Sequence, residues 1–114
     1  MSIYTHNKGT RIVTMNLPEE IHGRDKVRSD FGLLYNDEIG KTRFLINEEE
    51  SMSVSLLKLD FHRMQFISRA AADEILCQLE RLSCRVELNN IREHIHQMLH
   101  VVLKKHPNLN LLTF

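Results

Sequence analysis

Residues 53–82 read SVSLLKLDFHRMQFISRAAADEILCQLERL, and this stretch predicts a strand, a tight connection and a helix. Its first part holds a nearly continuous apolar run, formed by Leu56, Leu57, Leu59 and Phe61. A half-solvated strand would alternate between apolar and polar residues, so this run predicts a strand that is covered on both faces. The short polar link 62–65 follows, and we expect Phe66 and Ile67 to return the chain to the interior.

The second part of this stretch predicts an amphipathic helix over 68–82. Ser68 is expected to cap it, because a serine hydroxyl can accept a hydrogen bond from the free amides of a first helical turn. The apolar residues repeat at helical spacing, and they are Ala72, Ile75, Leu76, Leu79 and Leu82. The residues between them are polar, and they are Asp73, Glu74, Gln78, Glu80 and Arg81. The helix is therefore expected to have one buried stripe and one solvent-exposed face.

The remaining segments supply strands and helices on either side of this unit. Periodicity predicts strands at 11–17, 41–47 and 85–89 and helices at 23–35 and 90–106. Asn90 is expected to cap the last helix, and Pro107 ends it. The apolar stripe expected along this helix holds Ile91, Ile95, Met98, Leu99, Val102 and Leu103. The residues predicted to be buried together in the core are Leu59, Phe61, Phe66, Ile75, Leu79, Ile95, Leu99 and Val102. Residues 1–9 are polar and expected to be loose at their start. The apolar tail 109–114 is expected either to pack back on the domain or to offer a patch to a partner.

Two charged segments are interpreted as solvent-exposed rather than as binding sites. The acidic run 48–50 suits the loop of a charged hairpin, with binding of a cation or a basic partner as the alternative. In the predicted helix 23–35, the acidic Asp25 and Asp30 balance a group of cations. An anion-binding patch is the alternative for these cations, which are Arg24, Lys26 and Arg28.

The composition limits the classes of partner and compartment. Fifteen Lys and Arg residues cancel fifteen Asp and Glu residues, so the chain lacks the basic field that holds a nucleic-acid backbone. No apolar run approaches the roughly 20 residues of a membrane-spanning helix, and the first ten residues carry no secretory pattern. We therefore expect a cytoplasmic protein that binds neither nucleic acid nor membrane.

The only two cysteines are Cys77, inside the predicted helix, and Cys84, just beyond its end. Seven residues apart on or near a helix, their Cα atoms would lie about 10 Å apart, which is too far for an unstrained disulfide. We predict that both cysteines are reduced and act as small apolar side chains.

No complete pattern for a catalytic mechanism is found. The chain has four glycines and lacks the nucleophile elbow, the phosphate-binding loop and the dinucleotide fingerprint. Asp60 ends a strand, where α/β enzymes often place a carboxylate. A lone carboxylate does not make a mechanism, so Asp60 is interpreted as a loop cap. The sequence therefore predicts no enzymatic activity, no catalytic residue and no cofactor.

Seven histidines raise the question of a metal site. His96 and His100 are four residues apart on the last predicted helix, a spacing that lets two imidazoles reach one ion. No glutamate lies between them and no third ligand is identified, so we predict surface histidines and no metal site. A metal site and a pH-sensitive contact are the alternatives.

The motif LLKLDFHRMQFIS, followed by ADEI, resembles the central motif of STAS domains, and more closely a bacterial STAS-like family of unknown function. The resemblance covers the last half to two-thirds of the chain, whereas the first forty residues match only in general pattern. The residues that match are Leu57, Leu59, Asp60, Phe61, Phe66, Ile67, Ser68, Ala72 and Asp73. With the predicted order β-α-β-β-α-β-α, the resemblance implies one STAS-like α/β domain over 1–114. Its expected architecture is a small, mixed, mostly parallel sheet with helices packed on it, and its last strand–helix–strand crossover is expected to be parallel and right-handed.

The same resemblance points to a switch position at the start of the central helix. In anti-anti-sigma factors, which share the STAS fold, a Phe-Ile/Met-Asp element precedes the serine that a partner kinase phosphorylates. Alignment of Phe66 and Ile67 places Ser68 where the family has aspartate and Arg69 at the phosphoacceptor position. Arg69 cannot accept phosphate as serine does. The family's switch is therefore not expected here, unless Ser68 takes it over one residue early.

These observations predict a non-enzymatic regulatory module that works by protein–protein contact. The resemblance implies a partner of the histidine-kinase-like ATPase or kinase type, as in bacterial partner-switching signalling. The residues expected to bind it are His62, Arg63, Gln65, Ser68, Arg69 and Ala70. One alternative is a regulatory domain that binds a nucleotide or small ligand. Another is a metal-binding protein or enzyme built on Asp60 with His62, or on the His96 and His100 pair.

Overall fold

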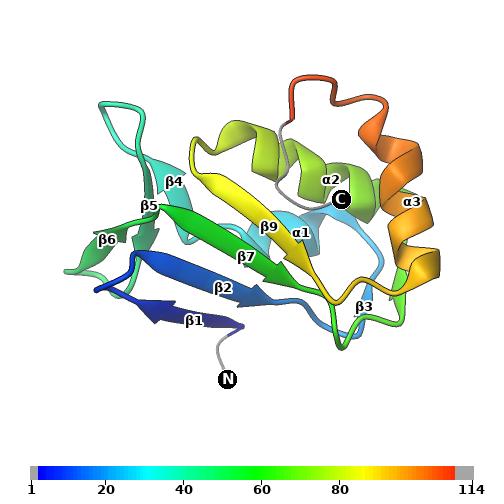
Figure 1. Cartoon of the computed structure of the whole chain (residues 1–114), viewed down its shortest axis with the longest axis horizontal. Coiled ribbons are helices and arrows are strands. Elements are labelled where there is room, and N and C mark those ends of the chain that lie inside the picture. Colours follow the sequence, from blue (N-terminus) through cyan, green and yellow to red (C-terminus); the bar gives the residue numbers. More distant parts are fainter. Residues whose placement is uncertain (1–2, 110–114) are drawn as a thin grey trace.

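Four strands form the main sheet of the computed structural model, which describes residues 3–109. Their order across the sheet is β1 (Tyr4–Asn7), β2 (Ile12–Asn16), β7 (Leu56–Asp60) and β9 (Arg85–Asn89), as Figure 1 shows. β2, β7 and β9 run parallel, and β1 pairs antiparallel with β2 at the edge. The predicted strands 11–17 and 85–89 are confirmed, and the crossover from β7 to β9 is parallel as expected.

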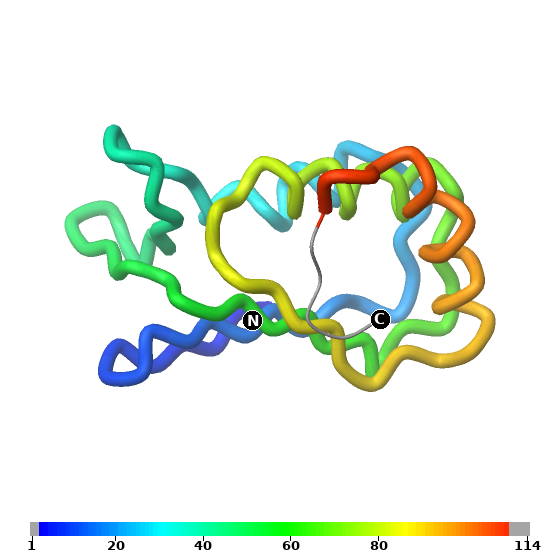
Figure 2. The backbone as a smooth tube through the Cα atoms, turned by 45° about the horizontal axis from the view of Figure 1, so that its top comes forward, coloured from blue at the N-terminus to red at the C-terminus, as the bar shows by residue number. Residues whose placement is uncertain are grey.

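The three helices of residues 3–109 lie on one side of this sheet (Figure 2), and they are α1 (Arg24–Asp30), α2 (Arg69–Arg81) and α3 (Glu93–Leu103). The buried strand residues on that side include Val13, Met15, Leu57, Leu59, Val86 and Leu88. The residues between them, such as Lys58, are only half-buried. β7 is therefore covered on one face, and the prediction of cover on both faces is wrong. The apolar run does not indicate two covered faces, because Leu56 lies on the half-buried face and Phe61 is buried beyond the end of the strand.

Two smaller sheets accompany the main sheet in the described part of the chain. β3 (Glu20–Ile21) pairs in parallel with β8 (Phe66–Ile67), just before α2. β4 (Leu34–Asn36), β5 (Thr42–Leu45) and β6 (Ser51–Ser53) form an antiparallel sheet.

The protein is thus a single α/β domain with mixed sheets, but the prediction of a mostly parallel sheet is wrong. Among residues 3–109, three strand pairs are parallel (β2–β7, β7–β9 and β3–β8) and three are antiparallel (β1–β2, β4–β5 and β5–β6). The predicted strand 41–47 exists as β5, but only short loops join it to β4 and β6, so it can pair only antiparallel with them. The acidic run 48–50 lies in the β5–β6 loop, as its interpretation as a hairpin loop predicts.

Helix α1 is shorter than the predicted helix 23–35. It ends at Asp30, and the chain then extends so that Leu34 of β4 pairs with Phe44 of β5. Both of these side chains are buried in the core, so strand pairing outweighs the helical spacing of Leu34. Gly32, a poor helix former, lies at the transition between the two elements.

The N-terminal segment contains a strand that the sequence analysis did not predict, and the start of the segment, which was expected to be loose, lies outside the described residues. Tyr4–Asn7 pairs along its whole length with β2. Tyr4 is buried, its ring lies 4.9 Å from that of Phe44, and its hydroxyl donates a hydrogen bond to the backbone carbonyl of Asp30. One aromatic residue therefore holds the edge strand against the end of α1.

The two long helices follow their predicted periodicity except at two polar residues. Ser68 caps α2 as expected, but Glu74, predicted on the solvent face, is buried. Asn90 does not cap α3, because the chain turns through a left-handed residue at Asn90 (φ 58°) and the helix begins only after Arg92. The Asn90 side chain instead donates a hydrogen bond of 3.1 Å to Asp60 Oδ1.

The core contains the predicted apolar residues with one exception. The confirmed members are Leu59, Phe61, Ile75, Leu79, Ile95, Leu99 and Val102. Phe66 is 44% exposed, because in the β3–β8 pair Ile67, and not Phe66, points inward.

Cys77 and Cys84 are free thiols, as predicted. Leu109 packs against the core, and the rest of the apolar tail lies outside the described residues. Within residues 3–109, no helix has the length and apolar character to cross a bilayer.

Candidate functional site

The start of α2 is built by segments from three parts of the chain. The hydroxyl of Ser68 accepts a hydrogen bond from the amide of Ala71 (3.1 Å) and donates one to the carbonyl of His22 (2.8 Å). The imidazole Nε2 of His94, in the first turn of α3, lies 2.8 Å from the carbonyl oxygen of Gln65. The β3–β8 region and the start of α3 therefore both meet the chain just before α2.

The residues predicted to bind a partner lie along this junction. His62, Arg63, Gln65, Arg69 and Ala70 are exposed, and Ser68 is half-buried. The first three belong to the link between β7 and β8, which contacts the beginning of α3. Arg69 and Ala70 belong to the first turn of α2. The structure therefore divides the predicted surface into a loop part and a helix part.

Arg69 lines two hollows in the protein surface. One, of about 370 Å³, lies between the start of α2 and the outer side of α3 and is lined by Arg69, His94, Gln97, Met98 and Val101. The other, of about 350 Å³, lies towards the end of α3 and is lined by Arg24, Arg69, Ala70, Asp73, Val102 and Lys105. Arg69 is thus the residue that the linings of these two hollows share.

The charges around these hollows are unevenly paired. Arg24 lies 2.9 Å from Asp73 Oδ2 and 3.4 Å from Glu74 Oε1, so its charge is paired with two carboxylates of α2. Within residues 3–109, no carboxylate lies at ion-pair distance from Arg69 or Lys105. This end of the molecule therefore carries two cations that the described part of the chain does not neutralise.

Two large apolar side chains are exposed in the elements that carry or flank these cations, one in β8, three residues before Arg69, and one on α3. Phe66 stacks on His22, with ring centroids 4.9 Å apart and an angle of 30° between the planes, and is 44% exposed. Val101 is 46% exposed on α3. We call the group Phe66, Arg69, His94, Met98, Val101 and Lys105 the Arg69 surface. It combines exposed apolar area with positive charge.

Most of the α3 contribution to this surface was missed by the sequence analysis. The family resemblance identified Arg69, whereas Phe66 was predicted only as a core residue. One signal could have indicated the contribution of α3. Val101 is apolar but lies off the stripe of Ile95, Leu99 and Val102, so it must face away from the core.

The group at Asp60 has the geometry of a loop cap. Its Oδ1 atom accepts hydrogen bonds from the backbone amide of His62 (2.9 Å) and from Asn90, and lies 3.1 Å from Nδ1 of His62. Partial burial raises the pKa of Asp60, but these hydrogen bonds outweigh it and hold the pKa below the usual range. The carboxylate therefore stabilises the turn after β7, as its interpretation as a loop cap predicts.

The two histidines considered for a metal site lie side by side on α3. The rings of His96 and His100 stack with centroids 6.2 Å apart and planes 13° from parallel. His94 makes its contact elsewhere, at Gln65.

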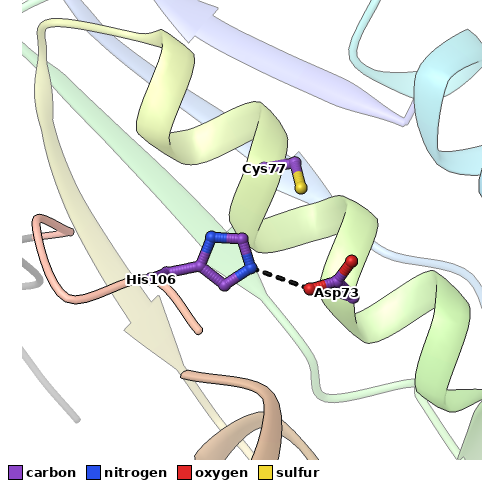
Figure 3. A group of neighbouring side chains, drawn as sticks. All are labelled: Asp73, Cys77 and His106. Atoms are coloured by element: carbon purple, nitrogen blue, oxygen red, sulfur yellow. Dashed lines mark hydrogen bonds and ion pairs between the residues drawn. The ribbon is translucent and has the colours of Figure 1, made fainter. Parts of the chain in front are cut away.

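A second cluster lies along the middle of α2 and includes His106, which follows the end of α3 and is buried, so the prediction of a surface histidine is wrong at this position. His106 is only 6% exposed, and its Nε2 atom lies 2.8 Å from Asp73 Oδ1 (Figure 3). Its Nδ1 atom lies 2.6 Å from Glu80 Oε1. Burial lowers the pKa of His106, but the hydrogen bonds with Glu80 and Asp73 raise it more, and the net shift is upward.

Cys77 completes this cluster. One ligand atom each of Asp73, Cys77 and His106 lies within 4.8 Å of the other two, which is close enough for the three to share a metal ion. Burial raises the pKa of the Cys77 thiol, and the nearby Asp73 and Glu74 carboxylates add to this shift. The thiol is therefore protonated at neutral pH in the metal-free protein.

Comparisons of the chain with models of protein families, with curated proteins and with solved structures find no match. The resemblance to STAS domains therefore stays a prediction that rests on the motif of the central strand and helix.

Proposed function

We propose that the protein is a regulatory module that acts by binding a protein partner, and not by catalysis, through the Arg69 surface. One observation carries this proposal. Exposed apolar side chains occur together with two cations, and neither cation has a carboxylate at ion-pair distance in residues 3–109. Isolated exposed apolar residues are common, but protein interfaces combine an apolar centre with charges at the rim.

The chemistry of this surface specifies what the partner must present. Phe66, Met98 and Val101 offer apolar contact, and Arg69 and Lys105 flank them with positive charge. A partner segment with one or two apolar side chains bordered by carboxylates would complement both features. Arginine binds carboxylates through a planar fork, so Arg69 would supply orientation as well as attraction.

The motif of the central strand and helix supports a more specific partner class. Its likeness to STAS domains favours a histidine-kinase-like ATPase or kinase, as in partner-switching signalling. Ser68 uses its hydroxyl in two hydrogen bonds, so phosphorylation there would break the cap of α2 and the link to His22. We propose that binding is constitutive or follows the nucleotide state of the partner, with Ser68 unmodified. Mass spectrometry of the protein from its native cells tests this, and substantial phosphate on Ser68 would contradict it.

The test of the surface uses matched pairs of variants. The partner is first isolated with the full chain and identified, and its affinity is then measured with the purified components. Arg69→Glu should weaken binding by about tenfold or more, because it places a negative charge against an acidic segment. Arg85→Glu makes the same change at an exposed position at the start of β9 and should leave the affinity unchanged.

The apolar half of the surface has its own pair of variants. Val101→Ser should weaken binding, whereas Ile39→Ser, at a 75% exposed position in the β4–β5 loop, should not. Equal affinities for wild type, Arg69→Glu and Val101→Ser would place the interface elsewhere and overturn the proposal.

A second candidate function, binding of a small anionic ligand, is favoured by one observation. The hollow towards the end of α3 is lined by Arg69 and Lys105, by the ion pair of Arg24 with Asp73, and by the apolar Ala70 and Val102. Calorimetric titration with inorganic phosphate and with ATP tests this function. Saturable binding that is lost in Arg69→Ala and Lys105→Ala would support it, and the absence of heat in wild type would exclude these ligands.

A further inference from the structure

We propose that Asp73, Cys77 and His106 form a binding site for Zn²⁺ or a similar transition-metal ion. Oxygen, thiolate and imidazole ligands together suit this class of metal, whereas Mg²⁺ and Ca²⁺ prefer oxygen alone. Figure 3 shows the three side chains converging between α2 and the segment that follows α3. The sequence predicted no metal site, and the alternatives that it raised were the His96 and His100 pair and Asp60 with His62.

The spacing of the three residues places their ligand atoms on one side of α2. Asp73 and Cys77 are four residues apart in the helix, so their side chains lie one above the other. His106 comes from 33 residues beyond Asp73 and is buried against the same face. Zinc bond lengths of about 2.0–2.3 Å set tetrahedral ligand atoms roughly 3.3–3.8 Å apart. The Asp73 Oδ1 to His106 Nε2 distance of 2.8 Å must therefore open slightly, and the limit of 4.8 Å on the other distances is compatible with small side-chain movements.

Neighbouring side chains orient two of the three ligands, His106 and Asp73. Glu80 Oε1 lies 2.6 Å from Nδ1 of His106, so the proton on Nδ1 stays there and Nε2 is directed at Asp73 and Cys77. A carboxylate behind a metal-binding histidine is a common way to fix its tautomer and increase its basicity. On the other side, Arg24 Nη1 lies 2.9 Å from Asp73 Oδ2 and leaves Oδ1 to face the site.

Binding of a metal requires two of the three ligands to lose a proton. Both ring nitrogens of His106 face carboxylates, so in the metal-free protein both are donors and the ring is an imidazolium. Asp73 and His106 then cancel, and the Cys77 thiol is neutral. Binding of Zn²⁺ releases the Nε2 proton and the thiol proton to solvent, and two negative ligands balance the ion. The net charge of Asp73, Cys77 and His106 is therefore the same in the metal-free protein, which holds the two protons, as in the protein that holds one zinc ion.

The proposed site has a structural consequence. A bound ion would tie the segment after α3 to the middle of α2 and so fix the end of the helix that carries Val101. Three protein ligands leave the fourth position of a tetrahedral ion for water or a side chain of another molecule. The inference stands independently of the proposed partner surface, because its residues and its test are different.

Titration with Co²⁺ tests the site, because cobalt reports its ligands through its spectrum. The full chain, reduced and freed of metal, is titrated while its absorption is recorded. We expect one equivalent of Co²⁺ to give a near-ultraviolet thiolate charge-transfer band and strong visible bands typical of tetrahedral geometry, and Zn²⁺ to remove both. Cys77→Ser should lose the charge-transfer band, whereas Cys84→Ser, its matched control, should keep it.

Further variants separate this site from surface histidines. Glu80→Gln should keep the spectrum but weaken binding about 10–100-fold, because the change removes the charge that orients His106. His96→Gln with His100→Gln should leave both spectrum and affinity unchanged. The proposal would be overturned if wild type showed no charge-transfer band, or if Cys77→Ser kept the band. So would loss of the band in the His96 and His100 variant.

A second measurement needs no variant. Alkylation of each cysteine in wild type is followed by mass spectrometry of its peptides, with and without Zn²⁺. Zinc should slow the modification of Cys77 and leave that of Cys84 unchanged, since only Cys77 would become a ligand. Equal rates at Cys77 with and without zinc would count against the site even if every cysteine variant failed to fold.

Discussion

The charged side chains at the start of α2 and those in its middle differ in what they contact. In the middle, Glu74 accepts a hydrogen bond of 2.8 Å from Gln78 and lies 3.2 Å from Arg28 Nη2. Arg81 reaches the carbonyl of Leu34 in β4 at 3.3 Å. At the start, Arg69 has no carboxylate at ion-pair distance in residues 3–109. The comparison suggests that charge in the middle of α2 holds the domain together, whereas charge at its start is available for binding.

The largest effect should come from the apolar core that supports both regions. Leu59→Ala in β7 and Leu99→Ala in α3 each remove a fully buried side chain and should each cost about 2–5 kcal/mol of unfolding free energy. Chemical denaturation measures this loss. A cost below about 1 kcal/mol for both variants would show that the core is assigned wrongly.

A smaller loss is expected at the buried carboxylate of the helix middle. Glu74→Gln keeps the shape but removes the charge that Arg24 and Arg28 share, and should cost about 1–2 kcal/mol. The two arginines stay partly solvated, which limits the penalty. Glu38→Gln, at an exposed position in the β4–β5 loop, is the matched control and should be neutral. Equal stabilities of the two variants would remove the distinction between the two regions of α2.

The loss of unfolding free energy at acidic pH tests the loop that leads to the Arg69 surface. Burial raises the pKa of Asp60, hydrogen bonds from His62 and Asn90 lower it, and the net shift is downward. A lowered folded-state pKa adds stability above the unfolded value of about 3.9, and this stability is lost as the pH falls through the folded value. Asp60→Asn should therefore lose stability at neutral pH and show a flatter decline below about pH 4. An unchanged loss of unfolding free energy at acidic pH in Asp60→Asn would contradict the assignment of Asp60 as a loop cap.

The smallest effect on stability is expected at Arg69. Arg69→Glu alters an exposed residue in the first turn of α2, where a negative charge is favourable to the helix dipole. The unfolding free energy should change by no more than about 0.5 kcal/mol, and any change should be a gain. A clear loss on thermal or chemical denaturation would mean that Arg69 contributes to the fold.

The parts that the sequence predicted well are those whose pattern is local. The cap at Ser68, the buried stripe of α2 and the stripe of α3 each follow from residues a few positions apart. The separate hairpin sheet and the short strands β1, β3 and β8 depend on pairing between distant segments, which no local period reports.

The site was predicted in part for the same reason. Arg69 and its neighbours were identified because they follow a recognisable motif. The contributions of α3 and the cluster at His106 depend on contacts across long stretches of chain. Arg24 and Glu74 are 50 residues apart, and His106 and Asp73 are 33 apart. Glu74 illustrates the limit, since its position in the helix predicts solvent exposure and only its arginine partners explain its burial.

Separate roles for the two regions of α2 are tested most directly by measuring unfolding free energy and partner affinity together for Arg69→Glu and Glu74→Gln. We expect opposite results: Arg69→Glu keeps its stability and loses about tenfold or more in affinity, whereas Glu74→Gln loses stability and keeps its affinity. If both variants lose stability and affinity in parallel, or if Arg69→Glu binds as wild type does, the two regions of α2 do not have separate roles.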